Sequence, residues 1–312
     1  MAADPVLVIS ARPGLAPDPP QARTIRSAVA DYWALTKPEV NFLIAIATFS
    51  GFYLALPGPL ADFPLLRLVH TLLGTLLVAS GTGTLNQYVE RNFDAQMRRT
   101  ARRPLAAGRL KSSAVLWFGI ALSTIGCIYL AGAVNVLASL LAIVTLLSYL
   151  FLYTPLKRKT PVCVLVGALP GAVPPLIGWA AASGTLRVEA WILYAILFLW
   201  QFPHFMAIAW MYREDYDRAG HFVLPHGHAR ARFVTLQTLL TVLALVPLSL
   251  LLASASQLRI FYCIGALLLS LGFLYYGTQF VLRRSSSAAR QLLVVSIIYL
   301  PLLFVLMMLV RR

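Results

Sequence analysis

The sequence predicts an all-α membrane protein with about nine transmembrane helices, and three observations support this fold class. Of the 312 residues, 59% are hydrophobic and only 12% are charged. The mean hydropathy is +0.77, and a soluble domain does not hide that much apolar surface. The apolar residues form long continuous runs and do not alternate with polar ones, which favours helices over a β-barrel.

Nine apolar runs are long enough to cross a bilayer as helices. Before them, residues 1–30 are rich in Ala, Pro and Arg and have little periodicity, so we expect a disordered cytoplasmic arm followed by a membrane domain over residues 31–312. The arm has no apolar secretory core, and its Asp4 and Asp18 disfavour a mitochondrial transit peptide, which points to a bacterial inner membrane. The expected spans are about 40–57, 64–88, 112–131, 135–153, 161–182, 188–210, 233–252, 258–279 and 291–310.

The basic residues are unevenly distributed between the two sides of the membrane. Of the 26 Lys and Arg residues, 21 lie in the N-terminal arm and in the loops after the second, fourth, sixth and eighth spans. Positive charge accumulates on the cytoplasmic side of membrane proteins, so the N-terminus and these loops are expected in the cytoplasm. The net charge of +15 therefore reflects topology, and nucleic-acid binding is not expected.

Three polar residues recur at four-residue spacing where the second span ends: Asn86, Glu90 and Asp94. Four residues advance an α-helix by about 400°, so these side chains share one face. An amide and two carboxylates on one face favour a hard cation such as Mg²⁺. The arginines that follow, among them Arg98 and Arg102, suit an anion such as a diphosphate.

A second acidic cluster lies in the loop after the sixth span, where Glu214 and Asp215 are candidates for a second metal. The two acidic loops follow spans whose numbers differ by four, which suggests an internal four-helix repeat and acids that converge over one central cavity. The alternative is that Glu90 and Asp94 only pair with Arg91 and Arg98 on a solvated helix end. A charge within the bilayer costs about 2.5–3.5 kcal/mol, which favours a functional site.

The motif N-x3-E-x3-D followed by M-x-R-T-x-x-R-P-L, from Asn86 to Leu105, resembles the first signature of the UbiA superfamily of intramembrane prenyltransferases. Within the superfamily, the combination of motifs is most similar to the branch that farnesylates haem. The further motifs that carry this resemblance are LTKP (35–38), YTPLKRKT (153–160), GAVPPLIGW (171–179), FPHF (202–205) and YREDYDRAG (212–220).

The resemblance implies nine helices around a central cavity, a Mg²⁺-dependent reaction, and farnesyl diphosphate and haem B as substrates. It implies one metal on Asn86, Glu90 and Asp94 and a second on Glu214 and Asp215. A downstream haem A synthase or a haem-copper oxidase assembly is the implied partner for the product. A related prenyltransferase that acts on a quinone precursor such as 4-hydroxybenzoate is the alternative. The residues implied for the diphosphate are Arg98, Arg102, Tyr153, Lys157, Arg158 and Arg218.

The histidines leave two interpretations open. His204, on an apolar helix within FPHF, is either a haem-orienting residue or an ordinary core residue. His221, His226 and His228 are surface residues or contacts of haem propionates. A transporter would place ionisable residues along a path through mid-helix, whereas the acids of this chain cluster at one rim, which favours an enzyme.

Overall fold

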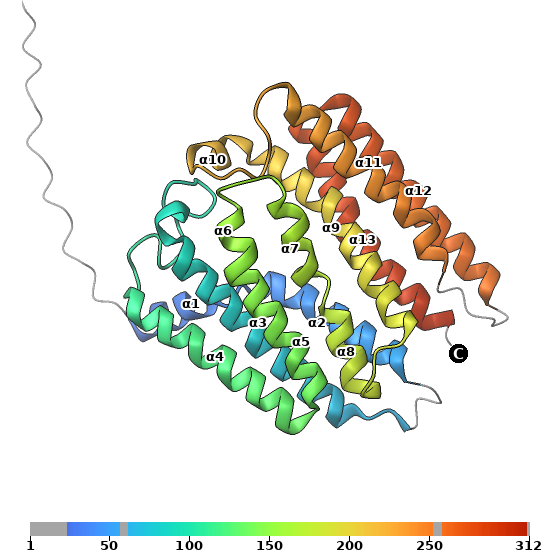
Figure 1. Ribbon diagram of the computed structural model, residues 1–312, viewed down its shortest axis with the longest axis horizontal. Coiled ribbons are helices and arrows are strands. Elements are labelled where there is room, and N and C mark those ends of the chain that lie inside the picture. The colour runs from blue at the N-terminus through green and yellow to red at the C-terminus, as the bar shows by residue number, and fades with distance from the viewer. Residues whose placement is uncertain (1–23, 57–61, 252–257, 311–312) are drawn as a thin grey trace, which may run out of the picture.

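The computed structural model describes residues 24–56, 62–251 and 258–310, and these residues form helices without any β-strand (Figure 1). Within them, nine helical stretches are long and apolar enough to cross a membrane, which confirms the predicted fold class. The stretches are α2 (Pro38–Ala55), α3 (Leu65–Asp94), α4 (Ser112–Ala133), Val136–Leu156, Cys163–Ser183, α9 (Val188–Met211), α11 (His228–Leu250), α12 (Arg259–Arg283) and α13 (Ser286–Val310).

Two of the nine spans are not continuous α-helices. The fourth consists of α5 (Val136–Leu147), a π-helical segment (Ser148–Tyr153) and α6 (Thr154–Leu156). The fifth is divided into α7 (Cys163–Gly171) and α8 (Pro174–Ser183). A proline has no N–H and clashes with the preceding turn, but it is tolerated in the first turn of a helix, so α8 starts at the Pro174–Pro175 pair.

α8 is a core helix that packs directly against the backbone of α2. A Cβ atom added at Gly178 would lie 1.9 Å from the carbonyl oxygen of Thr48, and one added at Gly51 would lie 2.0 Å from that of Pro175. Helices that cross a bilayer associate through such small residues, because lipid supplies no hydrophobic force between them. The two glycines therefore set the separation of α2 and α8.

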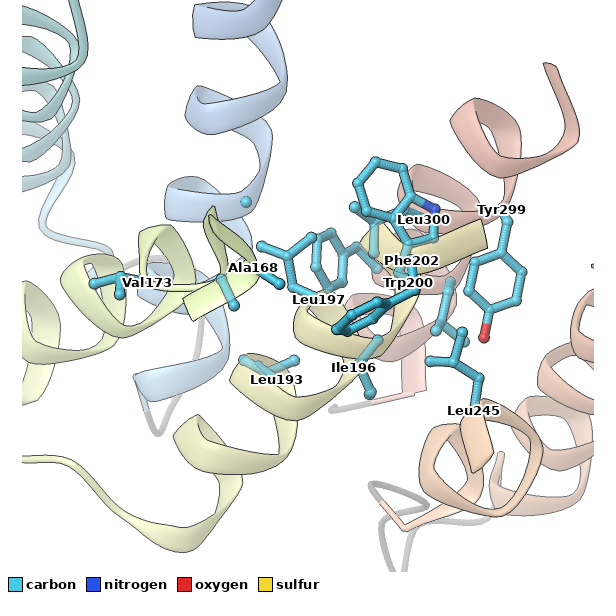
Figure 2. Close-up of a cluster of buried hydrophobic side chains, with 14 of the residues drawn as sticks. Ala168, Val173, Leu193, Ile196, Leu197, Trp200, Phe202, Leu245, Tyr299 and Leu300 are labelled. Atoms are coloured by element: carbon cyan, nitrogen blue, oxygen red, sulfur yellow. The ribbon is translucent and has the colours of Figure 1, made fainter. Parts of the chain in front are cut away.

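α9 forms the other part of the core and lies between the α7–α8 span and the pair α11 and α13. Its Leu193, Ile196 and Trp200 are buried, and Leu245 of α11 and Tyr299 of α13 lie against this helix (Figure 2). The Trp200 indole donates a hydrogen bond of 2.8 Å to the carbonyl oxygen of Ser296 in α13. α11 and α13 thus pack on α9, and α12 packs on α11 and α13.

The structure differs from the expected disordered arm of residues 1–30 at the end of that range. Residues 1–23 lie outside the described residues, but helix α1 (Ile25–Leu35) begins within the expected arm. Thr24 caps it, because its Oγ1 accepts a 3.2 Å hydrogen bond from the backbone N–H of Ser27. The prediction was wrong here because the helix is short and its buried face includes an acid, Asp31.

Replacing Gly178 by Ala is expected to lower the free energy of unfolding by about 1–3 kcal/mol, because α2 and α8 must move apart. The matched control is Gly272→Ala in α12, where an added Cβ meets nothing within 4 Å. Unfolding in mixed micelles of SDS and dodecyl maltoside measures both variants. Equal stability of the two variants would contradict the assigned α2–α8 contact.

Candidate active site

Three segments that are distant in the sequence gather at one end of the helix bundle: the end of α3 with residues 95–111, the turn after α6, and the segment around α10 (Arg213–Arg218) (Figure 1). The Phe222 N–H donates a 2.6 Å hydrogen bond to the carbonyl oxygen of Lys157. Arg99 donates to the Tyr216 hydroxyl at 3.3 Å. The two acidic loops therefore meet at the same end, as the sequence analysis expected.

The polar face of α3 points into the protein. Asn86, Glu90 and Asp94 retain only 1%, 7% and 1% of their accessible surface. Amide and carboxylate groups buried to this degree need compensating partners, since transfer from water is costly. We refer to these three side chains as the ligand face.

Both carboxylates of the ligand face pair with cations from other segments. The Lys157 ammonium lies 2.9 Å from Oε1 and 3.2 Å from Oε2 of Glu90. The Arg103 guanidinium donates from Nη1 to both carboxylate oxygens of Asp94, at 2.7 and 2.9 Å. Burial opposes the positive charge of Lys157, but the neighbouring Glu90 outweighs it and holds the pKa of the lysine well above its ordinary value.

The alternative of a solvated helix end is therefore excluded. Arg91 donates to the carbonyl oxygen of Tyr88 at 2.6 Å and lies over the ring of that tyrosine. Arg98 is exposed. The partners of Glu90 and Asp94 come from segments 67 and 9 residues away in the chain.

The third member of the ligand face is held by Lys37, which lies just before α2. Its ammonium donates to Asn86 Oδ1 at 3.2 Å, and the Asn86 amide donates to Thr154 Oγ1 at 3.3 Å. Burial, together with the charges of Arg103 and Lys157, lowers the pKa of Lys37 to about 7. Each side chain of the ligand face thus has its own basic partner.

The two acids of the second cluster lie in the short helix α10 and point in different directions. Asp215 is buried and accepts a 3.3 Å hydrogen bond from Arg218 three residues later. The neighbouring Glu214 side chain is 77% exposed and lies 3.6 Å from Arg213. Adjacent residues of a helix point about 100° apart, so only Asp215 turns inward with the first cluster.

The predicted diphosphate residues do not all reach the ligand face. Arg158 stacks on the ring of Phe93 at 4.3 Å, and the Lys157 ammonium lies 4.5 Å from the Tyr153 ring centre. Arg98 and Arg102 are exposed. The sequence reasoning missed Lys37 as a site residue and did not single out Arg103 among the four arginines.

The histidines separate into two environments. His221 is buried, not on the surface as assumed by default, and its Nδ1 has no hydrogen-bond partner among the described residues. Its ring lies 5.7 Å from that of Phe93, and burial lowers its pKa. His204 bonds through Nδ1 to Ser296 Oγ at 2.8 Å and stacks on Trp200 at 4.7 Å, so it helps to join α9 to α13.

The ligand face fits a magnesium ion bound together with an anionic substrate. Its donors are oxygens, the ligand type that Mg²⁺ prefers. Within the described residues, no three His, Cys, Asp or Glu side chains are grouped closely enough to hold a metal ion by themselves. Mg²⁺ typically keeps several waters and binds through one or two carboxylates plus substrate phosphates, so this sparse donor set is the expected one.

Comparison with known proteins gives a match to the model of the UbiA prenyltransferase family over residues 44–305. The chain belongs to this family. A protoheme IX farnesyltransferase of Solibacter usitatus is 49% identical, over 90% of the chain and 98% of the relative. A protoheme IX farnesyltransferase of Koribacter versatilis is 40% identical, over 92% of the chain and 95% of the relative.

Solved structures share the UbiA fold at low sequence identity. A structure described for digeranylgeranylglyceryl phosphate synthase has a TM-score of 0.70 at 18% identity and covers 91% of the chain and 98% of its own length. A UbiA homolog from Archaeoglobus fulgidus, bound to GPP and Mg²⁺, has a TM-score of 0.62 at 14% identity, covering 89% and 99%. These likenesses confirm the fold expected from the sequence motifs.

Replacing Lys157 by Ala is expected to destabilise this UbiA-family protein by about 3–5 kcal/mol, because it leaves the buried Glu90 without its counter-charge. The exposed Lys159→Ala is the matched control. The double variant Lys157→Ala/Glu90→Gln should recover part of the loss, as measured by unfolding in mixed micelles. A single variant as stable as the control would contradict the buried ion pair.

Proposed function

We propose that the protein converts haem B to haem O: it transfers a farnesyl group from farnesyl diphosphate, with water, to a haem vinyl group and releases diphosphate. The observation that carries this proposal is the buried ligand face of α3 with a separate cation on each of its members. The choice of haem as acceptor is supported by relatives up to 49% identical that are named protoheme IX farnesyltransferases.

Asn86, Glu90 and Asp94 would hold one magnesium ion, and Asp215, with the more exposed Glu214 beside it, would hold a second. When bound, Mg²⁺ would neutralise the charge that develops on the departing diphosphate. The residues of the chain supply the surroundings: burial of the two carboxylates keeps them dry, so their attraction for a cation is strong.

The cations of the site have a second role in this proposal. Lys157 and Arg103 pair with the carboxylates in this structure and would lie beside a diphosphate bound there. Arg158, over Phe93, adds a further positive charge. Guanidinium and ammonium groups bind phosphate oxygens through charge-assisted hydrogen bonds, so these residues would orient the leaving group. Arg98, Arg102 and Arg218 would act at the exposed edge, with Tyr153 below Lys157.

The proposed reaction balances as follows. The C–O bond of farnesyl diphosphate breaks, and its electron pair leaves with diphosphate. The π electrons of a haem vinyl group form the new C–C bond to the allylic carbon. The oxygen of a water molecule adds to the resulting cation beside the macrocycle and then loses a proton, which gives a hydroxyethylfarnesyl side chain. No covalent bond to the protein is formed.

Two histidines are candidates for the haem side. His221 is buried next to the loop contact and has an unpaired Nδ1 among the described residues, which suits a propionate or a diphosphate oxygen. His204 is engaged by Ser296 through one ring nitrogen, which fixes the ring for a possible contact through the other. His226 contacts Asp217 at 3.5 Å within the loop, and His228 is the first residue of α11.

We further propose a bacterial inner membrane with the N-terminus and the site loops in the cytoplasm. The support is the excess of Lys and Arg in the loops at the site end and the bacterial source of the relatives. A haem A synthase or haem-copper oxidase assembly would accept the product, which is too apolar to leave the bilayer freely.

The deciding experiment incubates the purified protein with Mg²⁺, farnesyl diphosphate, and either haem B or 4-hydroxybenzoate, and determines the mass of the extracted product. Farnesylated, hydrated porphyrin from haem B is the expected result. Product from 4-hydroxybenzoate alone would replace this function with quinone-precursor prenylation, and product from neither acceptor would refute both.

Asp94→Ala is expected to reduce turnover by about 10²-fold or more, because a ligand that stabilises leaving-group charge is lost. Chelation with EDTA should stop the reaction, and added Mg²⁺ should restore it. Glu189→Ala is the matched control, since this half-buried acid lies in the first turn of α9, at the other end of the bundle. Full turnover in Asp94→Ala, in protein that is folded by circular dichroism, would contradict the assigned metal role.

A further inference from the structure

Helix α1 has three distinct sides, although it is too short to span a membrane. Positions 28, 31, 32 and 35, at helical spacing, face the protein and are buried or half-buried. Ile25, Val29 and Trp33 follow one another at four-residue steps and are 85%, 63% and 64% exposed. Arg26 and Ser27 lie on the remaining side. A large apolar stripe therefore has no partner within the described residues.

The protein-facing side of α1 is fixed by polar contacts to the site end of the molecule. Asp31 accepts a 3.0 Å hydrogen bond from Arg109, in the loop after α3. The carbonyl oxygen of Leu35 accepts hydrogen bonds from Gln87 at 2.9 Å and Thr84 at 3.4 Å, both on α3. α1 is thus held beside the C-terminal part of α3.

The backbone turns sharply between α1 and the first span. Lys37 has φ of 53°, a left-handed conformation that costs a non-glycine residue about 1–2 kcal/mol. Pro38 follows immediately as the first residue of α2 and disfavours a helical conformation in the residue before it. α1 therefore does not continue into α2 as one rod, and it can lie across the direction of the spans.

We propose that α1 is an in-plane interfacial helix whose Ile25, Val29 and Trp33 insert into the lipid between headgroups and acyl chains. Lipid is the occupant that the surroundings favour, because Val40 and Phe42, at the start of α2, continue the exposed apolar surface at 51% and 67% exposure. Arg26 on the neighbouring side suits phosphate headgroups. A tryptophan within such a face matches the preference of Trp for the membrane interface.

This placement connects the membrane surface to the ligand face. α1 leads through Leu35, bonded to α3, to Lys37, bonded to Asn86. Lipid contacts that hold α1 in place would therefore also hold Lys37 against Asn86. This consequence, unlike the lipid contact itself, rests on the proposed function.

Site-directed spin labelling tests the lipid contact in the full-length chain. Val29→Cys and Ser27→Cys are made after the three native cysteines are replaced by Ala, and each labelled protein is reconstituted in nanodiscs of phosphatidylcholine and phosphatidylglycerol. The label at 29 should collide with oxygen, which dissolves in lipid, and the label at 27 with an aqueous nickel chelate. If the cysteine-free chain does not fold, quenching by brominated lipids, compared between the native chain and Trp33→Phe, gives the same information.

The other outcomes each overturn the proposal in a distinct way. Nickel access at 29 would place the stripe in water. Spin–spin broadening at 29 would indicate a second copy of the chain, and shielding from both reagents would indicate cover by protein, including residues 1–23.

A separate activity test uses Val29→Glu, with Ala30→Glu on the side away from the stripe as control. Val29→Glu should lower turnover in nanodiscs several-fold while Ala30→Glu does not. Equal turnover would remove the link to the ligand face and leave the labelling result standing. An inactive native protein would instead count against the proposed function.

Discussion

The structure depends on a set of charges buried at the end of α3. Glu90 and Asp94 are nearly inaccessible to water, and a buried carboxylate without a counter-charge destabilises a protein strongly. Their partners Lys157 and Arg103, with Lys37 on Asn86, come from three different connections of the chain. Charge neutralisation therefore brings together the end of α3, the loop after it and the turn after α6, and the hydrogen bond to Asn86 adds the segment before α2. The same interactions that build this end of the fold also build the candidate site.

The core below this end has the opposite character. α2 and α8 approach until backbone meets backbone at Gly51 and Gly178, and α9 fills the remaining interior with Leu193, Ile196 and Trp200. Such packing is rigid because a closely packed interior contains few voids into which a side chain could move. A rigid base beneath a polar rim suits an enzyme that must hold acidic side chains at fixed positions while substrates exchange. Charged groups that are already in position stabilise the transition state without the energetic cost of rearranging the site.

The sequence predicted the helices well, because a run of about twenty apolar residues has few other stable structures in a bilayer. It also predicted the ligand face, since four-residue spacing on one helix fixes a face without any knowledge of the fold. It could not choose among Arg98, Arg99, Arg102 and Arg103, because the turns of residues 95–111 decide which arginine returns to Asp94. Lys37 was missed for the same reason: its contact with Asn86 joins residues 49 apart.

The error at residues 25–30 has a different origin and bears on the whole site. A sequence pattern predicts a helix most clearly when its apolar residues form one buried face. In α1 the apolar residues are divided between a face that contacts the protein and an exposed stripe. Its inner side is held by an ion pair, Asp31–Arg109, which no periodicity reveals. Arg109 belongs to the same loop as Arg103, so one connection after α3 secures both α1 and Asp94. Displacement of α1 would therefore be transmitted to Asp94 through this loop and to Asn86 through Lys37.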